Sequence, residues 1–304
     1  MTLDPKSLEL FVRIATIGAI GKAGTELGFS RTAATERLQE LETTVGTQLL
    51  HRTTRTVSLT ADGEAFLIHA RRILSDIDEA LSELQDQTPR LSGQLRIASS
   101  ASFGRKFLVP IVAKFMELYP KLSVQLHLSD TPFDIVKNGY DLSIRLGSPG
   151  SSNLKSRHIG ESQRIFAAAP SYLEKHGAPT ELDELRKHNC IIRSDIRTWQ
   201  TRRPNGKNED FRVSGNFDTN LAEAVTEALL AGVGIARKCK WEVAEYLETG
   251  ELVRVLDDHT VMPQWGIFAV RPGLRKPPAR VSSFIDFIEQ EFKKIPALTK
   301  TISC

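Results

Sequence analysis

The sequence predicts an α+β protein of several domains, and three observations support this fold class. Residues 3 to 60 contain three short helical patterns followed by a β-prone hairpin. A long stretch with heptad spacing comes next, and the rest of the chain alternates between short apolar strands and amphipathic helices. This order predicts a small helical domain, a long connecting helix and a larger α/β domain.

The amino-terminal helices are predicted from the spacing of apolar residues. The first pattern repeats at i, i+3, i+4 and i+7, and a second pattern continues it after a break at Gly18. Gly28 and Phe29 then form a tight turn, and Ser30 is the predicted N-cap of a third helix. The apolar residues of the first two helices are Leu8, Phe11, Val12 and Ala15, followed by Ile20, Ala23 and Leu27.

The third helix presents a polar outer face near its amino terminus. Its inward stripe is formed by Ala34, Leu38, Leu41 and Val45. Threonine and arginine side chains opposite such a stripe can contact base edges in a DNA major groove. Glu36 either accepts a hydrogen bond from cytosine N4 or pairs with Arg37. The alternative to a DNA-binding domain is that the three helices form an ordinary small bundle with a polar face. The predicted DNA-contacting residues here are Ser30, Arg31, Thr32, Thr35, Glu36 and Arg37.

Residues 51 to 60 are β-prone and contain no acidic side chain. Arg52 and Arg55 in this hairpin could enter a minor groove or contact phosphates. The hairpin could also be plain surface structure, but its position directly after the third helix favours DNA contact. Residues 1–61 are therefore predicted to form a winged helix-turn-helix domain that binds double-stranded DNA.

The order of residues in this region resembles that of LysR-type transcriptional regulators, and the resemblance spans nearly the whole chain. Gly18, Gly21 and Gly24 depart from the pattern, because the family usually has Ser, Thr or Ala there, and an interior glycine costs about 1 kcal/mol relative to alanine. Glu36 stands where a basic residue is common, which leaves the operator sequence open. The matching residues are Phe11, Ala23, Leu27, Ser30, Ala33, Leu38, Leu41, Glu42, Gly46, Leu49, Leu50, Arg52, Thr53, Thr54, Arg55, Leu59, Thr60 and Gly63.

A single long helix is predicted from Asp62 to about Gln87, with Thr60 as its cap. It would be about 39 Å long, and its apolar residues alternate at spacings of four and three, which favours pairing with a partner helix. The resemblance implies that this linker helix joins two copies into a homodimer or homotetramer. The alternative is packing on the chain's own carboxy-terminal domain. The apolar seam consists of Phe66, Ala70, Ile73, Ile77, Ala80 and Leu84. Residues 62–92 are predicted to form this helix and a hinge, which begins where Thr88 and Pro89 break the helical pattern.

Residues 93–304 are predicted to form two α/β lobes. Strands at 95–98, 123–128 and 142–145 alternate with helices at 104–119 and 132–138, so the sheet should be largely parallel. The second lobe is predicted to contain strands at 163–169, 190–194, 211–217, 232–236 and 252–256, with helices at 170–176, 219–231 and 243–247. A strand at 265–270 then returns to the first lobe, and a last helix spans 278–292. The arrangement resembles the periplasmic-binding-protein-like effector domain of the family, with lobe I at 93–162 and 267–304 and lobe II at 163–266.

Ligands of such sheets bind beyond the carboxyl ends of the strands, where helix amino termini point inward. Hydroxyls and free N–H groups there could hold a carboxylate with help from the helix dipole. Each serine or threonine taken alone is equally explained as a helix cap, but their convergence on one cleft favours a pocket for a small organic acid. The predicted effector-binding residues are Ser99, Ser100, Ser102, Thr131, Arg145, Asp218 and Thr219.

Charge alone does not decide the function. The chain of 304 residues has a net charge of +3, and residues 1 to 61 hold seven lysines and arginines against six acidic residues. Phosphate binding must therefore depend on the local placement of a few side chains, doubled in a dimer. These side chains are Lys22, Arg31, Arg37, Arg52 and Arg55.

Other chemistry finds little support in the sequence. No nucleophile elbow, phosphate-binding loop or zinc-binding helix motif occurs, so the chain is not expected to be an enzyme or to need a cofactor. The seven histidines are scattered, which argues against a metal site. Three cysteines, no signal peptide and no long apolar run predict a reduced, cytoplasmic protein without membrane contact. A thiol switch is conceivable in this family, although Cys190 resembles a core residue and Cys304 a tail residue.

The combined expectation is a sequence-specific regulator of transcription controlled by an anionic metabolite between the two lobes. Binding would shift their relative orientation and thereby the spacing of the DNA-binding ends, DNA bending and the access of RNA polymerase. A solute-binding module with an accessory helical domain is the main alternative, and an enzyme on the same lobes is a third.

Overall fold

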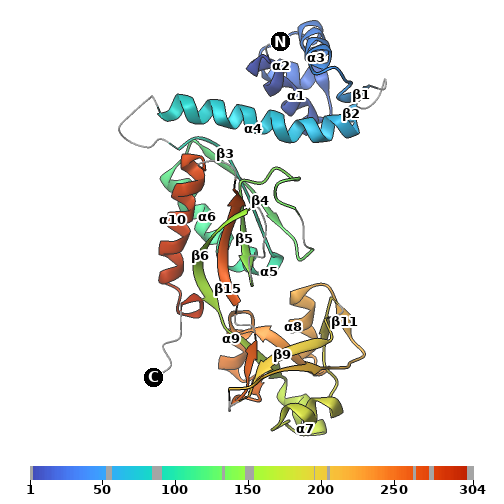
Figure 1. Ribbon diagram of the computed structural model, residues 1–304, viewed down its shortest axis with the longest axis vertical. Helices are drawn as coiled ribbons and strands as arrows, with labels where there is room; N and C mark the ends of the chain where they lie inside the picture. Colours follow the sequence, from blue (N-terminus) through green and yellow to red (C-terminus); the bar gives the residue numbers. More distant parts are fainter. Residues whose placement is uncertain are drawn as a thin grey trace.

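The computed structural model describes residues 3–52, 57–83, 91–131, 134–147, 154–194, 196–203, 206–262, 265–273 and 277–299. An amino-terminal helical domain, the long helix α4 and two α/β lobes follow one another along the molecule (Figure 1). The predicted α+β architecture is confirmed.

The amino-terminal domain is a three-helix unit with a short hairpin. It consists of α1 (Pro5–Ile17), α2 (Ile20–Glu26), α3 (Arg31–Val45), β1 (Leu50–Arg52) and β2 (Val57–Leu59), which are antiparallel strands. Asp4 caps α1, and the Ser30 hydroxyl accepts the Ala33 N–H at 3.2 Å at the start of α3. Apolar side chains from all three helices share one buried core, as their spacing predicted.

The packing around Gly24 explains part of the difference between α2 and the residue pattern of LysR-type regulators. A Cβ atom at this position would lie 2.8 Å from the Cβ of Ala34, so α2 and α3 approach too closely for a larger residue. Gly21 has no such restriction, since its nearest neighbour would be the Arg31 side chain at 3.8 Å.

The long helix α4 (Ala61–Glu83) follows directly. The Thr60 hydroxyl accepts the Gly63 N–H at 2.9 Å, which confirms the predicted cap. The expectation that the whole seam awaits a partner helix needs correction, because its first half is covered by the chain's own amino-terminal core. Phe66 and Ile73 pack against that core, Ala70 is buried within it, and the Phe66 ring lies 5.6 Å from that of Phe11. Ala80 is exposed, and Leu84 lies outside the described residues.

Lobe I contains a five-stranded sheet in the order β4-β3-β5-β15-β6. The strands β3 (Gly93–Ser99), β4 (Leu122–Leu128) and β5 (Leu142–Leu146) are parallel, while β15 (Trp265–Pro272) runs antiparallel to β5 and to β6 (Leu154–Ser162). The helical segments are α5 (Ala101–Phe103), a π-helical turn (Gly104–Leu108), α6 (Val109–Leu118), α10 (Ala279–Lys293) and a 3-10 turn (Pro296–Leu298). Helices α6 and α10 pack on this sheet in one core.

The predicted helix at 132–138 is wrong for the residues that the structure describes. Residues 135–139 form a turn, in which the Asp134 carboxylate accepts the Val136 and Lys137 N–H groups at 2.8 and 3.1 Å. Gly139 then adopts a φ of 62°, which ends any helical path. Pro132 and Phe133 lie outside the described residues.

Lobe II is built from short strands around the sheet β12-β7-β13. Its strands are β7 (Arg164–Ala168), β8 (Ile192–Arg193), β9 (Thr198–Arg202), β10 (Asn208–Arg212), β11 (Asp218–Thr219), β12 (Ile235–Cys239), β13 (Val253–Val255) and β14 (Thr260–Met262). Its helices are α7 (Pro170–His176), a 3-10 segment (Leu182–Lys187), α8 (Ala222–Leu230) and α9 (Lys240–Thr249).

The second lobe corrects several predicted boundaries. Most of the predicted strand at 211–217 is wrong: only Phe211 and Arg212 lie in a strand, at the end of β10, and residues 213–217 form none before β11 begins at Asp218. The predicted helix at 219–231 begins only at Ala222, because Thr219 pairs with Arg193 in a parallel strand. The strand after α8 also begins later, at Ile235. The return of β15 to lobe I is confirmed.

Candidate effector cavity and DNA-reading surface

A cavity of about 300 Å³ lies between the two lobes, at the carboxyl ends of β3, β4 and β5. This volume is at the lower end of what small-molecule sites provide, about 300 to 1,000 Å³. Both lobes contribute to its wall. The lining residues are Ser99, Ser100, Ser102, Ser129, Asp130, Thr131, Ser143, Ile144, Arg145, Leu146, Arg193, Cys239, Trp241, Glu242 and Trp265.

Five of the seven predicted effector-binding residues line this cavity. The Ser99 hydroxyl is committed to the scaffold, because it donates to the Ile144 carbonyl at 3.1 Å and is buried. Ser100 stands at the N-cap position of α5 without a side-chain cap bond, and Thr131 is exposed at the end of β4. Ser102 is buried beside them. The hydroxyls of Ser100 and Thr131 are thus placed to meet a ligand.

Arg145 brings a positive charge to the lobe I wall. It is half-buried at the end of β5, and its Nε lies 3.4 Å from the Ser143 hydroxyl. Among the residues that the structure describes, no carboxylate lies within ion-pair distance of this guanidinium. A partly desolvated cation without a carboxylate partner is a favourable site for an anion.

Asp218 and Thr219 do not belong to the lining of this cavity. Both residues lie in β11, where Thr219 pairs with Arg193 and its hydroxyl accepts the Leu221 N–H at 3.2 Å. The Asp218 carboxylate lies 3.8 Å from a guanidinium nitrogen of Arg197. They are separated from the cavity because α8 begins three residues later than its apolar pattern suggested.

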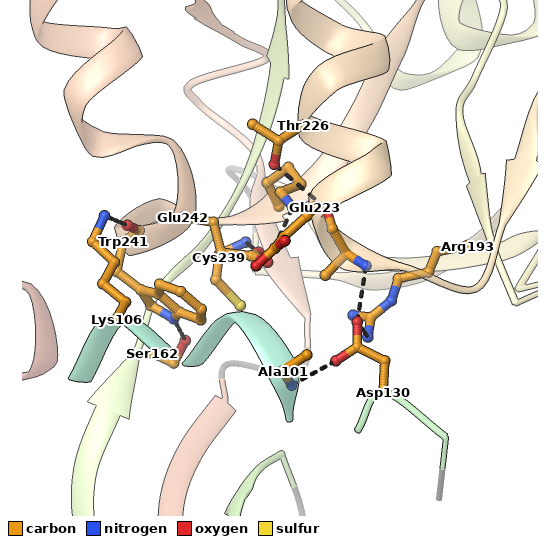
Figure 2. A network of polar contacts seen from close by, with 12 residues as sticks. Ala101, Lys106, Asp130, Ser162, Arg193, Glu223, Thr226, Cys239, Trp241 and Glu242 are labelled. Carbon is orange, nitrogen blue, oxygen red and sulfur yellow. Dashed lines mark hydrogen bonds and ion pairs between the residues drawn. The ribbon is translucent and has the colours of Figure 1, made fainter. Parts of the chain in front are cut away.

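Asp130, which the sequence did not single out, connects the two lobes. Its carboxylate accepts the Ala101 N–H of α5 at 3.0 Å and the Ala222 N–H of α8 at 2.9 Å (Figure 2). Arg193 approaches the same carboxylate at 3.4 Å, and the Asp130 side chain is only 3% exposed. The predicted free N–H group at the first of these helices is therefore already occupied by the chain itself. Its only sequence signal is an acidic residue two positions after the end of a predicted strand.

Trp241 is a second contact between the lobes. It comes from α9 of lobe II but packs in the core of lobe I, with its ring 5.4 Å from those of Phe103 and Phe107. Its indole N–H donates to the Ser162 hydroxyl at 3.1 Å, and its carbonyl accepts the Lys106 ammonium at 2.9 Å (Figure 2). These contacts hold the lobes in one relative orientation.

The remaining acidic group of the lining, Glu242, is already neutralised. Its carboxylate lies 3.0 Å from the Lys238 ammonium and also accepts the Cys239 N–H at 2.9 Å. Lys238 donates in addition to the Ala222 carbonyl at 2.8 Å and is 3% exposed. The pair thus organises the start of α9 and offers little free negative charge to the cavity.

The two described cysteines are buried free thiols. Burial raises the pKa of Cys190 to about 12, and burial followed by the nearby Glu242 raises the pKa of Cys239 to about 12. Since the thiolate is the reactive species, both side chains are poor nucleophiles at neutral pH. Cys190 belongs to a lobe II core, as its sequence suggested, whereas Cys304 lies outside the described residues.

The predicted DNA-reading residues lie at the amino-terminal end of α3. Arg31, Thr32 and Glu36 are exposed, while Thr35 is half-buried and its hydroxyl donates to the Arg31 carbonyl at 2.9 Å. Ser30 is exposed and serves as the N-cap.

Arg37 is engaged within the domain. Its guanidinium lies 2.6 Å from the Asp4 carboxylate and 4.8 Å from the Phe29 ring centroid, so it pairs with Asp4 instead of Glu36. The backbone of Arg52 belongs to β1, and Arg55 lies outside the described residues.

In the described part of the chain, no group of three or more His, Cys, Asp and Glu side chains is arranged to hold a metal ion. Within the same residues, no helix combines the length and apolar character needed to cross a bilayer.

A winged helical domain joined by a long helix to two lobes around a cavity defines a DNA-binding regulator with a ligand-sensing domain. Residues 5–64 match the family described as bacterial regulatory helix-turn-helix protein, lysR family, and residues 89–293 match the LysR substrate binding domain. The chain therefore belongs to the LysR family of transcriptional regulators.

Individual relatives agree over almost the full length. The transcriptional regulator DmlR of Escherichia coli K12 is 33% identical over 290 residues, which cover 94% of this chain and 93% of the relative. Among solved structures, the virulence activator AphB of Vibrio cholerae has 28% identity and a TM-score of 0.59, covering 94% of this chain and 98% of that chain. CrgA of Neisseria meningitidis has 28% identity and a TM-score of 0.60, with coverages of 95% and 99%. These relatives are named as transcriptional regulators and not as enzymes or transport proteins.

Proposed function

We propose that this LysR-type regulator binds a small anionic metabolite in the interlobe cavity and couples that binding to recognition of duplex DNA. The observation that carries the proposal is Arg145, a half-buried guanidinium on the cavity wall without a described carboxylate partner. The hydroxyls of Ser100 and Thr131 supply neutral hydrogen-bonding groups beside it. A carboxylate fits this set because arginine binds it in a planar, bidentate manner.

The DNA-binding surface is proposed to consist of the first turns of α3 together with the hairpin. Arg31 and Thr32 are exposed there and free to reach base edges, and Arg52 and Arg55 are proposed to contact the sugar-phosphate backbone. Arg37 is left out of this proposal, because its contacts with Asp4 and Phe29 support the domain itself.

The proposed active form is a homodimer or homotetramer with domain limits at 1–61, 62–92 and 93–304. The part of α4 beyond Ile77, where Ala80 is exposed, is the segment that we propose to pair with a second copy. An effector would shift the population of lobe orientations by binding one orientation more tightly than another. The changed spacing of the DNA-binding domains would then alter DNA bending and the access of RNA polymerase.

The DNA-binding part is tested with two arginine variants of the purified protein. Arg31→Ala should weaken binding to the operator by roughly 10- to 100-fold, since a base-contacting arginine contributes about 1 to 3 kcal/mol, and leave the melting temperature unchanged. Arg37→Ala, in contrast, should mainly lower the melting temperature, because it removes the contacts with Asp4 and Phe29. Binding measured by fluorescence anisotropy at two salt concentrations distinguishes them. Equal DNA affinity of wild type and Arg31→Ala would contradict the proposed surface.

The effector-binding part is tested by thermal shift with a panel of organic acids. We expect at least one acid to raise the melting temperature of the wild type. Arg145→Gln should abolish this shift, and Ser100→Ala or Thr131→Val should reduce it. Arg254→Gln, which removes an exposed arginine paired with Asp257 on lobe II, serves as the control. The absence of any shift across the panel would count against an anionic effector.

A further inference from the structure

Trp265 lies where the cavity meets the hinge between the lobes. The chain leaves lobe I after Ser162 and returns to it at Trp265, and these two residues are paired in the antiparallel register of β6 and β15. Trp265 also lines the cavity. It is the half-buried member of three tryptophans, since Trp199 and Trp241 are each only 3% exposed. Its side chain can therefore contact a ligand and the hinge at once.

The indole N–H of Trp265 is available as a hydrogen-bond donor. Among the residues that the structure describes it has no acceptor, whereas the indole N–H of Trp241 is bound at 3.1 Å. A Cβ atom at Gly147 would lie 3.5 Å from Nε1 of Trp265, so this edge of the ring lies beside the end of β5. Arg145, two residues before Gly147, lines the cavity. The donor therefore lies at the strand end that carries Arg145, where a ligand oxygen would satisfy it.

The ring of Trp265 also contacts the first strand of lobe II. The guanidinium of Arg164 lies over this ring, 4.3 Å from its centroid, and donates to the Met262 carbonyl at 3.5 Å. A cation–π contact depends on how the ring and the cation are placed relative to each other. Because Arg164 begins β7, a displacement of the ring acts on the strand that enters lobe II.

We propose that Trp265 contacts the effector and transmits its binding to the hinge. The indole N–H donates to an oxygen of the effector, and the ring packs against its carbon skeleton while retaining the contact with Arg164. This inference rests on the proposed function. It adds a neutral donor and an apolar surface to the charge that Arg145 provides.

The contact is tested by the tryptophan fluorescence of the full-length protein. The probes are mono- and dicarboxylic acids of three to six carbons, benzoate and the primary amides of all of them. We expect at least one acid to change the emission of the wild type. Trp265→Phe retains a ring without the N–H or the indole emission, so it should lose this change. Its affinity in isothermal titration calorimetry should fall by roughly 2- to 10-fold, as expected for one neutral hydrogen bond. Trp199→Phe, in the core of lobe II, is the matched control and should retain both.

Transmission to the hinge is measured as the effect of the same acid on DNA affinity. The DNA is an operator duplex selected from random sequences by the wild-type protein, whose affinity the acid should change by about 5-fold or more. This change should fall below about 2-fold in Trp265→Leu, which removes the ring, and in Arg164→Gln, which removes the cation above it. Arg164→Gln should still show the change in emission, because Trp265 remains. Melting temperatures identify a variant that fails to fold, and the other variant then decides.

The outcomes separate this inference from the proposed function. Acid binding that is lost in Arg145→Gln but unaffected by Trp265→Phe in emission and affinity would overturn the inference and retain the anionic effector. An undiminished DNA response in Trp265→Leu and Arg164→Gln would overturn the transmission to the hinge. Amides that bind as tightly as the acids and change the emission of Trp265 would overturn the anionic effector and retain the inference. Binding of none of these compounds would contradict both.

Discussion

Asp130 shows how much a single carboxylate can determine in this fold. It accepts N–H groups from helices of both lobes and its side chain is buried, so its removal leaves the N–H groups of Ala101 and Ala222 without this partner. Residues 101 and 222 are far from it in sequence, and no local pattern announces the contact. The serines and the threonine of the cavity could be predicted, because the sequence pattern indicates where the strands end. The contacts of Asp130 with the amino termini of α5 and α8 could not be predicted.

We expect Asp130→Ala to lower the free energy of unfolding by about 2 to 3 kcal/mol, since hydrogen bonds to charged groups contribute about 1.5 to 3 kcal/mol. Chemical denaturation of the full-length protein measures this loss. Asp257→Asn, which alters an exposed pair with Arg254, should change stability by less than about 0.5 kcal/mol. Similar stabilities of the two variants would mean that the carboxylate does not bind the lobes in solution.

The cysteines permit a second prediction at this scale. With pKa values of about 12, Cys190 and Cys239 should resist iodoacetamide in the native protein at pH 8 and react readily after unfolding in guanidinium chloride. The extent of labelling is measured by mass spectrometry on a Cys304→Ser variant, which lacks the third thiol. Rapid native labelling of Cys239 would instead indicate an accessible thiolate in the cavity.

At the scale of elements, α2 illustrates both the strength and the limit of pattern arguments. Its existence follows from apolar spacing, but the reason for its glycines is visible only where α3 crosses it. Gly24 lies against Ala34, whereas Gly21 has room for a methyl group. The turn at 135–139 makes the same point, because side-chain hydrogen bonds of Asp134 outweigh a weak helical pattern. In α4 the heptad spacing was real, but its first half serves the chain's own core.

We therefore expect opposite effects from two similar substitutions. Gly21→Ala should stabilise the protein by about 0.5 to 1 kcal/mol, because alanine reduces the entropy of the unfolded chain and favours the helix. Gly24→Ala should destabilise it by about 1 to 3 kcal/mol through overpacking against Ala34. Thermal unfolding followed by circular dichroism compares them, and a stabilising Gly24→Ala would show that α3 can move aside.

At the scale of the whole molecule, the two lobes are joined by more than the strands that cross between them. Trp241 lies in the core of the opposite lobe, and the exposed pair of Arg105 and Glu223 adds a contact at 2.7 Å. The domain order was predictable because each domain has its own local periodicity. The packing between lobes was not, since it joins residues such as Lys106 and Trp241 that are 135 positions apart.

We expect Trp241→Ala to cost about 3 to 5 kcal/mol and to separate the unfolding of the lobes into two calorimetric transitions. Trp241→Phe retains most of the ring contact and loses only the bond to Ser162, so it should retain a single transition at a slightly lower temperature. One cooperative transition in Trp241→Ala would show that the crossing strands alone couple the lobes.

Strand β3 spans from the cavity to the long helix. Ser99 lines the cavity, whereas Arg96, three residues earlier, donates to the Gly139 carbonyl at 2.6 Å, and a Cβ atom at Gly139 would lie 3.6 Å from Ile68 of α4. A strand of seven residues is about 23 Å long and is stiff when paired on both sides. A ligand that displaces one end of β3 should therefore also displace the helix α4 at the other end, without the unfolding of any segment between them.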